Sequence, residues 1–163
     1  MTATAGPVSL REAMSRFATG IVVLTAGGEH SHGMTANAFS SVSLDPPQVL
    51  CCVTRTARMH RAITSAGCFA VSVLSAEQEA TARYFAGGRR PDGATQFDAV
   101  DWAPGPCTGA PLLGGALAWL ECELAEAHEG GDHTIFVGRV LGSNRGPDRS
   151  ALLYFGGAYH RLA

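Results

Sequence analysis

Residues 33–60 read GMTANAFSSVSLDPPQVLCCVTRTARMH and gather side chains that could bind a flat ligand with polar edges. Thr35, Asn37, Ser40 and Ser41 are small and carry hydrogen-bonding groups, and the asparagine amide alone offers both an acceptor and two donors. Side chains of this size let a ring lie close to the backbone. The alternative is an ordinary half-exposed strand, in which serine and threonine are common.

The residues after the next strand could bind phosphate. Arg55, Thr56 and Arg58 bring two guanidinium groups and a hydroxyl to the start of a helix predicted at residues 57–65, which Thr56 could cap. Hydrogen-bond donors, positive charge and the helix dipole each stabilise a phosphate group. A ring-binding strand beside a phosphate-binding helix start is what flavin mononucleotide requires. The alternative is a pair of solvated arginines.

Other kinds of site chemistry are poorly represented. The sequence has no convincing catalytic triad, carboxylate pair or metal-ligand cluster. His30 and His32 lack partners at metal-ligand spacing, and we interpret both as surface or loop residues. The five cysteines include no Cys-x-x-Cys pair, and we expect them to be reduced and structural. The sequence therefore predicts no metal site.

Length and composition favour one globular domain over residues 1–163. Apolar residues make up 46% of the chain, charged residues only 16%, and the net charge is −2, so neither nucleic acid nor an anionic membrane is expected as the main partner. No apolar run approaches the roughly 20 residues of a membrane helix. The first ten residues, MTATAGPVSL, lack the features of a secretion signal, and we expect a cytoplasmic protein.

The elements that must position these side chains are mostly strands. We predict strands at residues 21–25, 33–42, 48–53, 69–74, 117–128, 134–141 and 152–162. Short helices are predicted at residues 9–17, 57–65 and 75–86, and the first and last of these open with a capping box. Because long helices do not regularly separate the strands, the order favours a small antiparallel barrel with peripheral helices over a doubly wound sheet.

The residue patterns of three segments predict their burial, pairing or exposure. The strand at residues 48–53 is apolar nearly throughout, which predicts burial on both faces. The strand at 117–128 alternates, with Glu121 and Glu123 opposite its apolar face, and should form a hairpin with residues 134–141. Residues 87–115 are rich in glycine and proline, and we expect a long surface loop that could move as a cover.

Five blocks in this order, GIVVLTA, HGMTANAFSSVSLDPPQVLCCV, CFAVSVL, ECEL and GDHTIFVGRV, resemble the small flavin reductases of two-component flavin monooxygenase systems, especially the actinomycete members. The resemblance covers about residues 10–162. It implies an FMN-binding split β-barrel, antiparallel with Greek-key connections, which binds flavin at a homodimer interface. Such proteins use NADH or NADPH to reduce FMN or FAD and release the reduced flavin to a separate monooxygenase.

The resemblance also implies which residues contact the cofactors. The cofactor-binding positions would be Thr35, Ala36 and Asn37 along the ring, Ser40 and Ser41 near its polar edge or the ribityl chain, Cys52, Val53 and Thr54 close to the ring, Arg55, Thr56 and Arg58 at the phosphate, and Phe85 and Ala86 in a segment that closes over the flavin.

His133 is the residue that the resemblance places at the nicotinamide, where it would position the ring through hydrogen bonds. The alternative is a turn histidine that fixes the hairpin beside Asp132. Hydride transfer needs no protein nucleophile, because the cofactors carry the reaction. Tyr154, Phe155 and Tyr159 could pack the core or shield the site of a second subunit.

Two other functions remain open at this stage. A split-barrel oxidase would keep its FMN tightly bound and pass electrons to oxygen or a dedicated substrate, and a non-enzymatic flavin carrier would never meet nicotinamide. The sequence does not distinguish NADH from NADPH or FMN from FAD, because it carries no dinucleotide-binding fingerprint.

Overall fold

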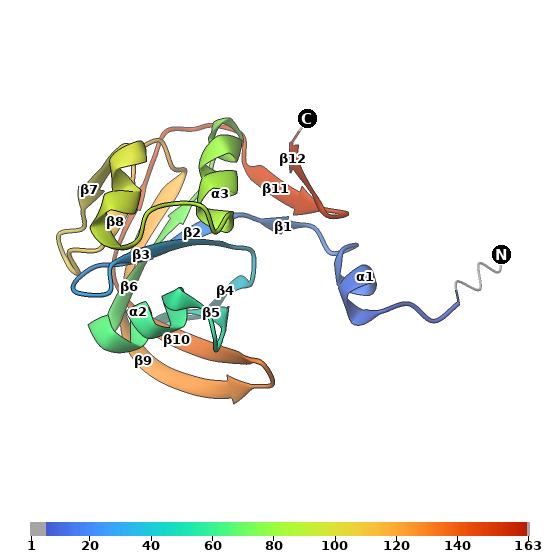
Figure 1. Ribbon diagram of the computed structural model, residues 1–163, viewed down its shortest axis with the longest axis horizontal. Helices are drawn as coiled ribbons and strands as arrows, with labels where there is room; N and C mark the ends of the chain where they lie inside the picture. The colour runs from blue at the N-terminus through green and yellow to red at the C-terminus, as the bar shows by residue number, and fades with distance from the viewer. Residues whose placement is uncertain (1–5, 163) are drawn as a thin grey trace.

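The computed structural model describes residues 6–162, and its centre is an antiparallel sheet of seven strands (Figure 1). In spatial order the strands are β3 (His32–Ala36), β2 (Val22–Ala26), β6 (Cys68–Val73), β9 (Ala118–Gly130), β10 (His133–Arg145), β5 (Pro47–Thr54) and β4 (Phe39–Leu44). The prediction of a mainly-β antiparallel fold is confirmed. Residues 1–5, part of the segment that lacks the features of a secretion signal, lie outside the described residues.

Short elements surround this sheet. They are the helices α1 (Leu10–Met14), α2 (Arg58–Ala66) and α3 (Glu79–Ala86), the 3-10 turns η1 (Ala76–Gln78) and η2 (Gly93–Ala99), and the strands β1 (Thr19–Gly20), β7 (Trp102–Pro104), β8 (Pro111–Leu113), β11 (Leu152–Phe155) and β12 (Ala158–Arg161). The predicted last strand, residues 152–162, is therefore a hairpin of β11 and β12, because Gly156 and Gly157 turn the chain with positive φ. Among residues 6–162, no helix combines the length and apolar character needed to cross a bilayer.

The two longer helices cover opposite faces of β2. Leu24 belongs to a buried cluster that includes Met59 and Ile63 of α2, whereas its neighbour Val23 belongs to a second cluster that includes Phe85 of α3. This follows from the strand geometry, since successive side chains point to opposite faces. Burial on both sides explains why β2 is apolar at almost every position.

The predicted strand at residues 33–42 is two strands. It breaks at Asn37–Ala38, because β3 pairs with β2 and β4 pairs with β5, at the other edge of the sheet. The carbonyl of Ala38 accepts a hydrogen bond from the backbone N–H of Cys52 at 3.0 Å. The hydroxyl-rich stretch therefore connects the two edges of the sheet.

Burial of β5 on both faces was a wrong prediction. Val49, Cys51 and Val53 are buried, whereas Leu50 and Cys52 between them are only half-buried. The apolar run thus has one face in the core and one face that this chain leaves partly uncovered.

The segment 87–115 is not the irregular surface loop that its composition predicts. It contains η2 and the β7–β8 hairpin, and Phe97 and Leu113 insert into the cluster beneath α3. Each of the two elements contributes one residue to that cluster, so no periodic pattern of apolar residues marks the segment as packed. Only its first residues, near Arg90 and Asp92, adjoin the cavities described below.

The β9–β10 hairpin is confirmed, but Glu121 does not face solvent as its position in the alternation predicts. Its side chain is 4% exposed, and its carboxylate accepts hydrogen bonds from the backbone N–H groups of Cys107 and Thr108 and from the Thr108 hydroxyl, at 2.7–3.0 Å. The β7–β8 hairpin therefore covers this part of the sheet.

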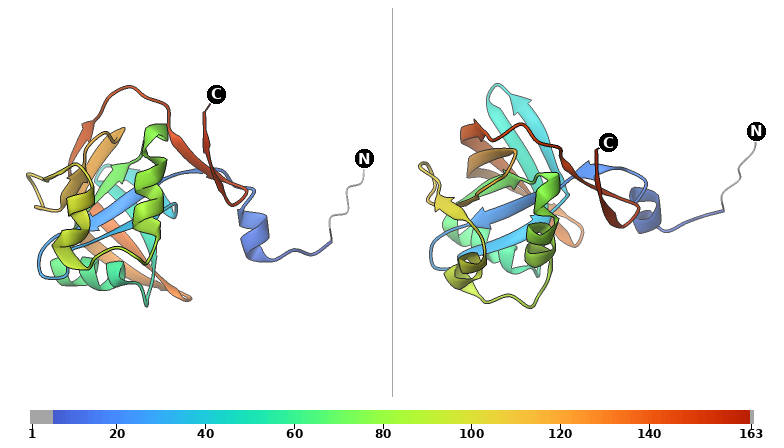
Figure 2. Two further views of the ribbon diagram at one scale, coloured as in Figure 1. Left: turned by 45° about the horizontal axis from the view of Figure 1, so that its top comes forward. Right: turned by 90° about the horizontal axis from the view of Figure 1, so that it is seen from above.

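α1 lies apart from the main body in every view (Figures 1 and 2). Its capping box is formed in part, because the Ser9 hydroxyl accepts a hydrogen bond from the N–H of Glu12. The apolar residues Leu10, Met14 and Phe17 are 77%, 53% and 66% exposed. In contrast, Tyr154 and Tyr159 pack against the cluster beneath α3, which favours the core-packing alternative for them.

All five cysteines, each within the described residues, are free. Cys51 and Cys122 are buried in the core, and burial raises the pKa of each thiol to about 12. The thiolate is the reactive form, so these two side chains act as apolar packing, as predicted.

Candidate functional site

The ends of β5 and β10 bring Thr54 into contact with His133. The two residues are partners in the antiparallel register, and Thr54 Oγ1 lies 3.3 Å from His133 Nε2. The other ring nitrogen, Nδ1, lies 2.7 Å from Asp132 Oδ1, and this hydrogen bond is the main cause of the lowered pKa of Asp132. An ionised carboxylate accepts from Nδ1–H, and Nε2 faces the threonine hydroxyl. The half-buried imidazole is therefore held in one orientation.

The chain from Thr54 to Arg58 leads from β5 into α2. Arg55 donates from its backbone N–H to the carbonyl of Asp132 and from its guanidinium to the carbonyl of Gly131, so this arginine fastens the β9–β10 turn. The prediction that Thr56 caps α2 is wrong, because the N-cap residue is Ala57, which has no side chain that could bond to the first turn. Backbone N–H groups at the helix start thus lack a side-chain cap and remain available to an anion.

A cavity of about 280 Å³, which we call the α3 cavity, lies between the start of α2, β3 and the end of α3. Arg58, Phe85 and Ala86, all predicted site residues, line it together with Arg90. Two guanidinium groups beside an uncapped helix start suit the phosphate of a flavin. The Phe85 ring is fully buried 5.6 Å from the Phe97 ring, so it supports this cavity from the core and does not close over it.

None of the predicted polar residues of the stretch 33–42 lines this cavity. Thr35 donates its hydroxyl hydrogen to the carbonyl of Ala82 at 2.7 Å, which ties β3 to α3. Asn37, Ser40 and Ser41 have exposed side chains. The Asn37 side chain lines a separate, mainly apolar hollow of about 260 Å³, which also involves residues 17–22.

The remaining predicted contacts differ in which side chain faces outward. Ala36 and Val53 pack against or within the cluster beneath α2, so they could offer a ligand only backbone groups. Cys52 and Thr54 lie on the half-buried face of β5. The carbonyl of Ala38 accepts from Cys52, and Thr54, at the end of the same strand, is the register partner of His133.

His32 is a residue whose position the sequence did not predict. It is 9% exposed rather than superficial, and Arg90 donates a hydrogen bond to its Nε2 at 3.1 Å and another to the carbonyl of Gly33. Burial, followed by the charges of Arg90 and Arg58, lowers the pKa of His32 to about 4. The ring is therefore neutral at pH 7. No local signal indicates this contact, since Arg90 is 58 residues away along the chain.

The depressed pKa of His32 predicts loss of stability in mild acid. The unfolded chain takes up a proton on this ring near pH 6.5, whereas the folded protein does so only near pH 4. The free energy of unfolding should therefore fall as the pH drops from 6.5 to 4, by at most about 3 kcal/mol. In urea titrations across this range, His32→Gln should remove most of this slope. His128→Gln, at an exposed histidine, should keep it, and equal slopes in both variants would contradict the prediction.

Comparison with known proteins places these features in a family. A family model described as "Flavin reductase like domain" matches residues 14–163. The chain is 52% identical over 156 residues to the NADH-dependent FAD reductase of Streptomyces globisporus. This alignment covers 96% of this chain and 86% of that protein. It is 37% identical over 154 residues to the flavin-dependent monooxygenase reductase subunit HsaB of Rhodococcus jostii, with 94% and 76% covered.

A solved structure agrees with these sequence relationships. BorF, the flavin reductase component of a bacterial two-component tryptophan halogenase, superposes with a TM-score of 0.90 at 52% identity, over 94% of this chain and 96% of that one. The fold, the family model and the relatives thus agree over almost the full length, and the chain belongs to the flavin reductase like domain family.

Proposed function

We propose that this protein is an NADH-dependent flavin reductase that releases its reduced flavin to a separate flavin-dependent monooxygenase. The observation that carries the proposal is the oriented His133, which Asp132 and Thr54 hold at the end of β5, where the chain leads into the basic, uncapped start of α2. A relative that is 52% identical and named as an NADH-dependent FAD reductase supports this assignment. One relative named as the reductase subunit of a flavin-dependent monooxygenase, and another named as the flavin reductase component of a two-component halogenase, support the partner.

The proposal extends to assembly and location. We propose a single split-barrel domain that forms a homodimer, since Leu10 of α1 and Phe17, three residues after its end, are exposed and β5 leaves one face partly uncovered. A second copy of the chain would cover these apolar surfaces. The hydride donor of this enzyme, NADH, is a cytoplasmic metabolite. We therefore propose that the protein acts in the cytoplasm. Light scattering coupled to gel filtration should give twice the monomer mass of 16.9 kDa.

The protein's part in the reaction is binding and orientation. When bound, NADH and flavin supply hydride transfer from nicotinamide C4 to flavin N5. The His133 ring, whose orientation Asp132 and Thr54 fix, can position the nicotinamide amide by hydrogen bonding. Arg58 and the start of α2 would hold the flavin phosphate, and the backbone near Asn37–Ala38 would offer polar groups to the ring edge. Holding two rings in contact accounts for catalysis without a protein nucleophile.

A turnover assay tests the function and separates its alternatives. Purified protein is mixed with NADH, NADPH, FMN or FAD in each combination, and nicotinamide absorbance is followed. Many turnovers that depend on added free flavin are expected. Turnover independent of added flavin would instead indicate an oxidase with tightly held FMN, and flavin binding without nicotinamide oxidation would indicate a carrier.

His133→Ala should lower kcat/KM for NADH about tenfold, because it removes one well-oriented hydrogen bond to the nicotinamide. The Kd for flavin, measured by fluorescence titration, should stay unchanged. Asp132→Asn, which weakens the hold on the ring, should have a smaller effect in the same direction. His128→Ala, at an exposed histidine of the same hairpin, is the control. An unchanged kcat/KM in His133→Ala would contradict the proposal and favour the alternative, in which His133 only fixes the hairpin beside Asp132.

A further inference from the structure

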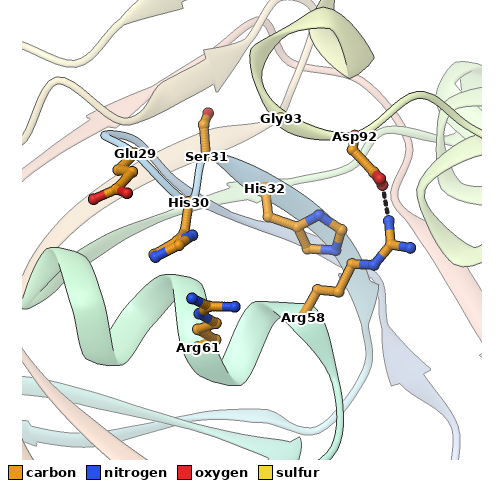
Figure 3. A pocket seen from close by; sticks show the side chains of 8 residues that line it. All are labelled: Glu29, His30, Ser31, His32, Arg58, Arg61, Asp92 and Gly93. Atoms are coloured by element: carbon orange, nitrogen blue, oxygen red, sulfur yellow. Dashed lines mark hydrogen bonds and ion pairs between the residues drawn. The ribbon is translucent and has the colours of Figure 1, made fainter.

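A second cavity, which we call the α2 cavity, lies next to the α3 cavity and has a volume of about 460 Å³ (Figure 3). Residues 29–32 form one wall, Arg58 and Arg61 of α2 form another, and Asp92 and Gly93 close the top. This volume is within the range of about 300–1,000 Å³ typical of small-molecule sites. None of the predicted flavin contacts except Arg58 lies in it.

The two cavities are neighbours that share side chains. His32 and Arg58 line both, so the Arg58 side chain borders both cavities. Arg58 is paired with Asp92, but both side chains are largely exposed, so the pair costs little to exchange for another anion. A ligand whose phosphate binds Arg58 in the α3 cavity could therefore extend into the α2 cavity.

The α2 cavity has unpaired flat groups. In Figure 3 the side chains of His30, from the turn before β3, and Arg61, from α2, point toward each other across it. Within residues 6–162, neither side chain makes a hydrogen bond or ion pair with another protein group. An imidazole and a guanidinium plane can stack on a purine, and Arg61 can also pair with a phosphate oxygen. Glu29 and Ser31 add acceptors for an exocyclic amine and for ribose hydroxyls.

We propose that the α2 cavity binds the adenosine monophosphate half of FAD, with Arg61 and His30 selecting FAD over FMN. This rests on the proposed flavin reductase function. NADH carries the same adenylate group, but His133, which would position its nicotinamide, lines neither cavity. The flavin phosphate and the adenylate, in contrast, would meet at Arg58. FMN would occupy only the α3 cavity.

Arg61→Ala and the double variant His30→Ala/Arg61→Ala test this assignment in the full-length protein. Arg61 is exposed, His30 is only half-buried, and alanine favours a helix at position 61, so the variants should fold. Arg161→Ala, an exposed arginine outside both cavities, is the matched control. The Kd for FAD and for FMN is measured by flavin fluorescence, and the KM for NADH is measured with FMN as acceptor.

We expect Arg61→Ala to raise the Kd for FAD about tenfold, the usual effect of losing one charge-assisted contact, while the Kd for FMN and the KM for NADH stay constant. The double variant should lose more, and 5′-AMP should displace FAD but not FMN from the wild-type protein. Equal weakening of FMN and FAD would overturn the proposal, as would an unchanged Kd for FAD. A rise confined to the KM for NADH would also overturn it, because the adenylate would then belong to the nucleotide donor.

Failure of this inference is distinguishable from failure of the proposed function. If wild-type protein turns over NADH and FMN but Arg61→Ala leaves the FAD-to-FMN affinity ratio unchanged, only the adenylate assignment is refuted. If wild-type protein binds both flavins but oxidises no nicotinamide, the reductase function is refuted, and the Kd values for FAD and FMN can still be compared between the variants.

Discussion

Replacing Gly33 by valine is expected to lower the free energy of unfolding by about 3 kcal/mol and to weaken flavin binding. A Cβ atom at this position would lie 2.7 and 2.8 Å from two ring carbons of Phe85 and 3.2 Å from Phe97. Both rings are fully buried, so neither can swing away. The Gly33 backbone also donates to Gln96 and accepts from Arg90, which lines the α3 cavity. A shift of β3 would therefore disturb the site as well as the core.

The requirement at Gly33 is for space and not for an unusual backbone conformation, since its φ is negative. Gly20→Ala is a suitable control, because a Cβ there meets nothing within 4 Å. Gly33→Ala combined with Phe85→Leu should cost less than the sum of the two single changes, because the smaller side chain makes room for the methyl group. Urea denaturation and flavin titration measure both effects. Normal stability and normal flavin affinity in Gly33→Val would refute the close-packing argument.

Local patterns in the sequence predicted local structure well. Ser9 and Glu12 begin α1 as expected, and the N–H of Ser75 donates to Gln78 Oε1 at 3.0 Å before α3. The β9–β10 hairpin also follows from alternation and from Gly131, which has positive φ. In each case the interacting residues are close in sequence or in strict register, so the sequence pattern alone predicts which residues pair.

Contacts between distant segments were missed for the opposite reason. Nothing near His32 indicates that Arg90 will bury it, and nothing near Glu121 indicates that Cys107 and Thr108 will turn toward it. Residues 87–115 pack into the cluster beneath α3 through isolated side chains such as Phe97, whose spacing follows neither the helical nor the strand period. The same limit hid the α2 cavity, since β3, β4 and β5 separate its two flat side chains along the chain.

The candidate site falls between these two cases. The register of β5 against β10 brings Thr54 to His133, so a correct strand pairing already predicts that contact. The sequence pattern did not show which residues face inward. Thr35 bonds to α3 and Val53 points into the core, although both belong to the stretch that looked ligand-binding. Strand alternation identifies the two faces of a strand, but tertiary packing decides which face is open.

Glu121→Ala is expected to lower the free energy of unfolding by about 3 kcal/mol while leaving flavin affinity unchanged. The substitution removes a buried carboxylate oxygen that accepts from two backbone N–H groups and one hydroxyl of the 107–108 turn. Donors left without a partner cost about 1–3 kcal/mol each when they stay buried, and partial hydration of this turn reduces the total. The measurement is urea denaturation, with flavin titration of the folded protein as the second readout.

Glu123→Ala provides a matched comparison two residues along the same strand. The Glu123 carboxylate pairs with Arg139, and both side chains are about half exposed, so this change should cost about 1 kcal/mol or less. Glu121→Gln keeps one oxygen acceptor, so its loss of stability should fall between those of Glu121→Ala and Glu123→Ala. This ranking of the three variants follows if hydrogen bonds to a buried acceptor hold the β7–β8 hairpin on the sheet. Equal losses at positions 121 and 123 would instead mean that charge alone matters here, and the turn would not depend on β9.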